Sequence, residues 1–120
     1  MSIPPEALQK LLSEIEQKAA FSQQQIGIVK SQMAAKNRES RMLQLTTVEL
    51  DGLPKDANIY EGVGKMFVAC PPSEVKVRIA KESEDLKKDV ENLEKKLNYL
   101  ETTYKNSKEH LEAIFKNGGR

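Results

Sequence analysis

The side chains that most often carry out chemistry in proteins are scarce in this sequence. His110 is the only histidine and Cys70 the only cysteine among 120 residues. With one of each, the chain has neither the several imidazoles of a histidine-rich metal site nor the second thiol of a metal-binding or redox pair. We therefore interpret His110 as a solvated helix residue. Cys70, close after Phe67 and Val68, is interpreted as a small strand residue.

The remaining motifs with possible chemistry are also too weak to define a site. Gly62 and Gly64 are spaced as a turn, and they open no helix as a dinucleotide-binding fingerprint would. No phosphate-binding loop is present, and the many carboxylates are typical of a solvated helix face. We expect no enzymatic activity, no catalytic residues, no metal, no cofactor and no use of ATP.

Composition narrows the class of protein further. The residues are 38% hydrophobic, 31% charged and only 5% aromatic, which favours either disorder or an extended helical assembly over a compact globule. The 19 basic and 18 acidic residues are evenly spread, so no basic stripe predicts binding to nucleic acid or to a membrane surface. No apolar run reaches the roughly 18 residues of a membrane span. We expect a soluble, cytoplasmic protein.

A seam of regularly spaced residues predicts a helix, rather than disorder, over about residues 5–51. Its steps alternate between four and three without a break, which is the a/d pattern of a coiled coil. The outer part of the seam is apolar, whereas Lys36 and Ser40 make its inner part polar. The seam residues are Leu8, Leu12, Ile15, Ala19, Ser22, Ile26, Val29, Met33, Lys36, Ser40, Leu43, Thr47 and Leu50.

A connector over residues 52–72 separates this helix from the next. Gly52 is suited to the left-handed conformation that ends helices, and Pro54 cannot continue a helix. A run rich in β-branched and aromatic residues follows, with glycines at its centre, and predicts a β-hairpin over about residues 58–70. Either Gly62 or Gly64 could supply the positive φ of its turn. A lone hairpin is marginal in water, so we expect its free edges to pair with another chain.

A second helix is predicted over residues 73–117, with Ser73 as its N-cap. Its seam has the same unbroken alternation of four and three, and acid-first pairs such as Glu84 and Lys88 support it from outside the seam. The seam residues are Ile79, Ser83, Leu86, Val90, Leu93, Leu97, Leu100, Tyr104, Ser107, Leu111 and Ile114.

The nearly equal lengths of the two seams favour a fold in which the two helices pack back against each other. The predicted fold class is mainly α, a long antiparallel two-helix coiled coil joined by a small β-hairpin, in a single domain over residues 1–120. The alternative is two parallel coiled coils formed between different chains. In the antiparallel arrangement both chain ends lie together, at what we call the arm tip. It comprises Leu8, Leu11, Leu12, Ile15, Leu111, Ile114 and Phe115.

Two interpretations of the arm tip remain open from the sequence. Leu11 and Phe115 lie beside the seam, and they either widen the contact between the two helices or leave an adaptable apolar surface on fraying terminal turns.

The hairpin carries a family resemblance. The string from Tyr60 to Val68, YEGVGKMFV, resembles the central signature of prefoldin subunits, and the flanking helices extend the resemblance to the whole chain. Because residues 52–72 leave room for only one hairpin, the chain resembles the β-type subunit, which has two strands where the α-type has four.

The resemblance implies a function and a set of partners. Family members form a heterohexamer, so this chain would join two α-type and three further β-type subunits through strands that build a double β-barrel. The assembly holds unfolded proteins such as actin and tubulin at the tips of its coiled coils and delivers them, without ATP, to the cytosolic group II chaperonin. A structural tether or adaptor, including a subunit of a prefoldin-like assembly without holdase activity, is the alternative.

Two sets of residues carry these roles over by position. The arm tip would bind clients. The hairpin residues expected to form the subunit contacts are Ile59, Tyr60, Val63, Gly64, Met66, Phe67 and Val68.

Overall fold

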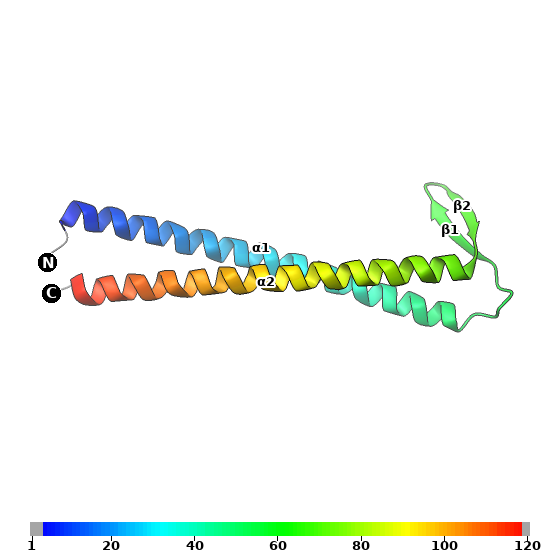
Figure 1. Cartoon of the computed structure of the whole chain (residues 1–120). Coiled ribbons are helices and arrows are strands. Elements are labelled where there is room, and N and C mark those ends of the chain that lie inside the picture. The colour runs from blue at the N-terminus through cyan, green and yellow to red at the C-terminus, as the bar shows by residue number, and fades with distance from the viewer. Residues whose placement is uncertain (1–3, 119–120) are drawn as a thin grey trace. The chain divides into compact units, whose positions relative to one another are not determined.

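The chain folds into two long helices with a β-hairpin between them (Figure 1). The structure is a computed structural model that describes residues 4–118. Helix α1 spans Pro5–Asp51, strands β1 and β2 span Ile59–Val63 and Met66–Cys70, and helix α2 spans Pro72–Gly118. The predicted fold class, mainly helical with two long helices flanking a two-stranded antiparallel hairpin, is confirmed.

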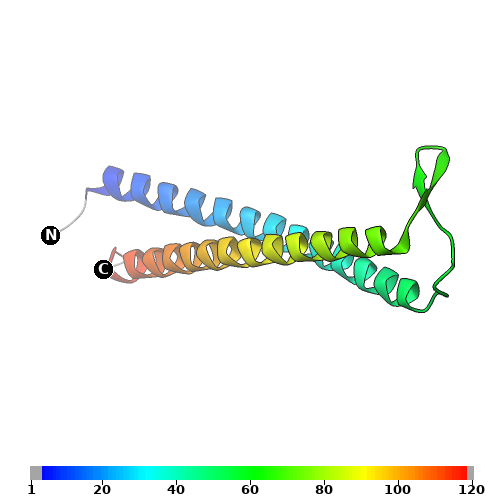
Figure 2. The ribbon, with the colours of Figure 1, turned by 45° about the vertical axis from the view of Figure 1, so that its right-hand side comes forward.

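Both helices contribute to each of two compact units. Unit 1 contains the described residues of Met1–Met33 and Asn92–Arg120, and unit 2 is Ala34–Glu91. In unit 1 the beginning of α1 lies beside the end of α2 (Figure 1). In unit 2 the end of α1 pairs with the beginning of α2, and the hairpin stands beside the first turns of α2 in both views (Figures 1 and 2).

The predicted seams are the buried faces of the helices. In unit 1, Val29 is completely buried, and Ile15, Ala19 and Leu100 are each 8% exposed. In unit 2, Leu86 is also 8% exposed. Every other predicted seam residue is at least half-buried. The step of four and three was therefore a reliable guide to which side chains face a neighbouring helix.

The seam of α2 begins earlier than the sequence analysis placed it. Val75 is buried and lies four residues before Ile79 on the same face of the helix, although a strict alternation of four and three would place the next seam position at Lys76. The backbone N–H groups of Glu74 and Val75 donate to the carbonyl of Pro71, at 3.1 and 3.2 Å. Pro71 is thus the capping residue and Pro72 the first helical one, where a missing N–H costs nothing. The prediction of Ser73 as the N-cap was wrong by two residues.

The end of α1 also differs in detail from the prediction. The N–H of Gly52 donates to the carbonyls of Val48 and Glu49, both at 3.2 Å, but Gly52 does not have a positive φ. The expected left-handed cap is therefore not used. Asp51 is unfavourable at the negative end of the helix dipole, and Lys76 of α2 places its ammonium 3.0 Å from this carboxylate.

The polar inner part of the α1 seam is accommodated by an ion pair in unit 2. Lys36 Nζ lies 3.5 Å from Asp89 Oδ2 on α2. Because both side chains remain partly exposed, at 37% and 51%, the charges stay solvated and the pair contributes little to stability. A lysine at a seam position is tolerated here because its long stem reaches the edge of the helix pair.

The turn of the hairpin has its positive φ at Gly64 and not at Gly62. Strand β1 ends at Val63 and β2 begins at Met66, so Gly64 and Lys65 form a two-residue turn. Gly64 has φ +61°, and no other residue among residues 4–118 has a positive φ. A positive φ only at the first central residue is the pattern of a type II′ turn, which suits the twist of a hairpin.

Candidate functional site

The hairpin presents two faces whose residues alternate along each strand. Ladder partners are Ile59 with Cys70, Glu61 with Val68, and Val63 with Met66, and these pairs share one face. Tyr60 pairs with Ala69, and Gly62 with Phe67, on the other face. At Gly62 an added Cβ would lie 3.7 Å from a ring carbon of Phe67, so the Phe67 ring lies over the backbone of its cross-strand partner.

The hairpin exposes most of its apolar surface. Phe67 is 76% exposed and Met66 70%, and the exposed side chains belong to both faces. Among the predicted assembly residues only Ile59 is half-buried. The exposed large apolar residues of the hairpin are Tyr60, Val63, Met66, Phe67 and Val68. Five large apolar side chains exposed within ten residues are a concentrated patch that favours contact with another protein.

The strand edges of the hairpin are open as well. Within residues 4–118 the sheet has only the strands β1 and β2, so each strand has one edge whose backbone groups lack a strand partner. Such edges readily accept further strands. The hairpin therefore offers both backbone hydrogen bonds and apolar side chains to a neighbouring chain.

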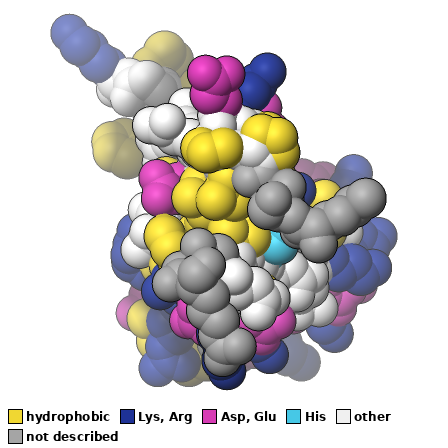
Figure 3. Space-filling view, turned by 90° about the vertical axis from the view of Figure 1, so that its left-hand side faces the viewer, with side chains coloured by type: hydrophobic (Ala, Val, Ile, Leu, Met, Phe, Trp, Pro, Cys, Tyr) yellow, Lys and Arg dark blue, Asp and Glu magenta, His cyan; other side chains and the backbone are white. Residues whose placement is uncertain are grey.

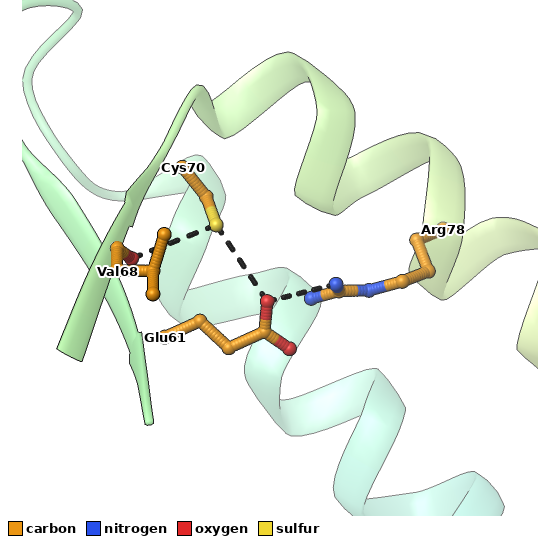
Figure 4. Close-up of polar contacts among 4 residues, drawn as sticks. All are labelled: Glu61, Val68, Cys70 and Arg78. Atoms are coloured by element: carbon orange, nitrogen blue, oxygen red, sulfur yellow. Dashed lines mark hydrogen bonds and ion pairs between the residues drawn. The ribbon is translucent and has the colours of Figure 1, made fainter. Parts of the chain in front are cut away.

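A polar cluster attaches the hairpin to α2 (Figure 4). Arg78 of α2 donates through Nη1 to Oε2 of Glu61 in β1, at 2.9 Å. The thiol of Cys70 lies 3.6 Å from the same carboxylate oxygen and 3.6 Å from the carbonyl oxygen of Val68. The face that carries Glu61 is thus turned toward α2, and one carboxylate joins both strands to the helix.

The ionisation of this cluster follows from its contacts. The hydrogen bond from Arg78 holds the pKa of Glu61 below its usual value. Partial desolvation, and then the adjacent carboxylate of Glu61, raise the pKa of the Cys70 thiol. Cys70 is therefore held as a neutral thiol near pH 7, which is the opposite of an activated nucleophile.

No local sequence pattern predicted this cluster. Glu61 was recognised only as part of the family string, although a carboxylate within an apolar strand is a signal that a cation lies nearby. The partner, Arg78, is 17 residues further on, on a different element, and no local pattern relates the two positions.

The arm-tip residues all lie in unit 1, on the first turns of α1 and the last turns of α2. Figure 3 views this end of the molecule and shows apolar side chains gathered between charged ones. Ile15 is only 8% exposed and Phe115 is 59% exposed, while the other five are half-buried. Most of the predicted client-binding residues are thus buried or half-buried between the two helices. Phe115 is the one large side chain of the arm tip that remains exposed.

Over residues 4–118, no group of three or more His, Cys, Asp or Glu side chains is placed to hold a metal ion. Within the same residues, neither helix has a stretch long and apolar enough to cross a membrane.

Comparison with known proteins identifies the family. A family model described as prefoldin subunit matches residues 13–118. The chain belongs to the prefoldin subunit family. The resemblance carried by the hairpin string is thereby confirmed, and the name of the prefoldin family implies a chaperone cofactor built from several subunits.

Individual prefoldin relatives agree over most of the chain. A protein named probable prefoldin subunit 1 from Schizosaccharomyces pombe is 37% identical over 107 residues, covering 89% of this chain and 96% of the relative. Prefoldin subunit 1 of Mus musculus is 28% identical, with 89% and 88% covered. A crystal structure of the prefoldin beta subunit from Thermococcus strain KS-1 aligns with a TM-score of 0.46 and 28% identity, over 97% of this chain and 91% of that one.

Proposed function

We propose that this chain is a β-type subunit of a heterohexameric prefoldin that acts as an ATP-independent holdase in the cytoplasm. The observation that carries the proposal is the exposed apolar hairpin in a chain of this family. Tyr60, Val63, Met66 and Phe67 are each more than half exposed, and burying them in a neighbouring subunit would be favourable.

In this proposal the hairpin is the assembly element. Its two open edges pair with strands of neighbouring subunits, and its apolar side chains pack inside the resulting barrel. A single hairpin per chain supports the β-type, so two α-type and three further β-type subunits complete the hexamer.

The arm tip is the proposed client site. It binds unfolded segments of proteins such as actin and tubulin, for delivery to the cytosolic group II chaperonin. Phe115 is the exposed anchor of this surface. The half-buried leucines become available when the last helical turns fray, which costs little at a helix end.

Two measurements test the proposal. The chain is co-expressed with α-type and β-type partner subunits and analysed by native mass spectrometry, and a complex of six chains is expected. The purified complex is then mixed with denatured actin, and light scattering is expected to fall. If the chain never enters such a complex, or if the complex leaves aggregation unchanged, the proposal fails.

A structural tether is the second candidate function, and the burial of the arm tip favours it. Ile15 is buried and Leu8, Leu12, Leu111 and Ile114 are half-buried in the seam. Such residues hold the two helices together without offering a client surface. A hexamer that forms normally but does not suppress aggregation of actin would support the tether over the holdase.

A further inference from the structure

A groove with an apolar floor and an acidic rim runs between the helices of unit 2. It encloses about 440 Å³. Leu43 and Leu86 belong to the seam and form the floor, together with Met42, which is 67% exposed. The rim consists of four carboxylates, Glu39 on α1 and Glu82, Asp85 and Asp89 on α2. We call this feature the acidic groove.

The charges of the acidic groove have the same sign on both helices, which does not favour the pairing of the helices. Glu39, Glu82 and Asp89 each directly precede a seam residue, so they occupy the positions that flank the seam. In coiled coils these positions usually carry opposite charges on the two helices and form salt bridges between them. Here both helices place acidic side chains at these positions. Asp89 pairs with Lys36, but within residues 4–118 neither Glu39 nor Glu82 forms a salt bridge with the other helix.

The repulsion also acts along α2. Glu82 and Asp85 are three residues apart, and Asp85 and Asp89 are four apart, so both pairs are neighbours on the helix surface. Like charges at these spacings destabilise a helix. Among residues 4–118, Lys36 is the only cation within 4 Å of a rim carboxylate, and it contacts Asp89 alone. A cationic occupant would relieve repulsion that the fold of this chain leaves in place.

We propose that the acidic groove binds a basic amphipathic helix of a partner protein. The apolar face of that helix covers Met42, Leu43 and Leu86, as amphipathic helices do when they enter apolar grooves. Its Lys or Arg side chains, one on each flank, reach the carboxylates of Glu39 and of Glu82 and Asp85. The charge of the rim therefore selects the partner, and the exposed methionine supplies an adaptable apolar contact.

The acidic groove is separate from both surfaces of the proposed function. It lies in unit 2 and contains no hairpin residue, and every arm-tip residue belongs to unit 1. The groove can therefore be tested independently of whether the chain assembles into a hexamer or suppresses aggregation.

The test measures binding of a designed helical peptide to the full-length chain, alone and in its assembled complex. The peptide has about 18 residues, enough to populate a helix, with leucines along one face and lysines on both flanks. A matched peptide carries glutamate in place of every lysine. Fluorescence anisotropy at about 50 mM and at about 300 mM salt gives the dissociation constants. We expect the lysine peptide alone to bind, and more weakly at high salt because screening reduces attraction between exposed charges.

Two groove variants and one matched control identify the site. Glu82→Gln with Asp85→Asn should weaken binding about three- to tenfold, as expected for two exposed charge pairs. Met42→Ser should weaken it about tenfold or more, because an apolar contact is lost. The control, Glu84→Gln with Glu91→Gln, removes the same charge from the same helix outside the groove and should leave binding unchanged.

The variant Glu82→Gln with Asp85→Asn, which we call the rim variant, should also fold well. A loss of binding can then be assigned to the groove. The variant removes the repulsion between Glu82 and Asp85 but also their attraction to Arg78, Lys81 and Lys88 on the same helix. Its melting temperature should therefore change by less than about 2 °C. The proposal is overturned if the glutamate peptide binds equally well, or if the control weakens binding as much as the rim variant does. It is also overturned if neither peptide binds while the rim variant alters self-association in sedimentation, because the occupant is then a second copy of this chain.

Discussion

The hairpin and the arm tip are both apolar, but they differ in how the chain uses that surface. Phe67 of the hairpin is 76% exposed, whereas Ile15 of the arm tip is 8% exposed. In the hairpin two strands cannot bury both of their faces, so their apolar side chains remain available to another chain. At the arm tip the second helix covers most of them. The difference teaches that an apolar sequence marks a binding surface only where the chain lacks its own element to cover it.

The strongest test of this comparison is a charge placed on each region. Phe67→Asp should abolish entry into a complex with other prefoldin subunits, because an aspartate buried in a subunit interface lacks a partner. The helicity of the isolated chain should be unchanged, since Phe67 is exposed within it. Phe115→Asp is the matched variant at the arm tip and should assemble normally. Size-exclusion chromatography and native mass spectrometry measure both, and equal assembly of the two variants would contradict the assignment.

Shortening a side chain should affect the stability of the isolated chain more at the arm tip than in the hairpin. Ile15→Ala should lower the free energy of unfolding by about 2 kcal/mol, at the low end of the range for buried residues because the core is thin. Val63→Ala in the hairpin should change it by less than about 0.5 kcal/mol. Urea denaturation followed by circular dichroism measures the two values. A larger loss from Val63→Ala would mean that the hairpin has a core of its own.

The turn of the hairpin provides a smaller and more local test. Gly64→Ala forces an L-residue to a positive φ and should destabilise the hairpin by about 1–2 kcal/mol. Gly62→Ala should be nearly neutral, because the added methyl would make ordinary contact with Phe67 at 3.7 Å. Hydrogen exchange of the strand amides reports both changes. Similar protection in the two variants would argue against the turn at Gly64 and Lys65.

The smallest expected effect concerns the cluster that attaches the hairpin to α2. Because the pKa of Glu61 is lowered, its pairing with Arg78 contributes fully above the ordinary pKa of a glutamate. That contribution is lost as the pH falls through the lowered value. Glu61→Gln removes both the pair and one cause of the raised pKa of Cys70.

Alkylation of Cys70 measures this change. At about pH 8 the Glu61→Gln variant should react about two- to threefold faster, because more thiolate is present. Glu84→Gln, which removes a carboxylate elsewhere on α2, should react at the rate of the unaltered chain. An unchanged rate in Glu61→Gln would show that desolvation alone holds the thiol neutral.

The sequence by itself determined the elements and their buried faces. An alternation of four and three is dictated by helix geometry, so Leu86 and Leu100 were predicted to be buried without any knowledge of the partner helix. The hairpin string carried the family resemblance, and it predicted the strands because β-branched residues and central glycines are local signals. It left open whether Gly62 or Gly64 supplies the positive φ of the turn. Helix ends were less certain, as Ser73 and Gly52 show, since capping depends on which backbone groups meet.

Only the tertiary structure decided which side chains from different elements come together. Arg78 with Glu61, Lys36 with Asp89, and the acidic groove all join residues far apart in the sequence. The same is true of exposure. Leu8 and Phe67 are both apolar in sequence, and one is half-buried while the other is open. Periodicity predicts which face of an element is apolar, but the covering of that face depends on a neighbour that local sequence does not specify.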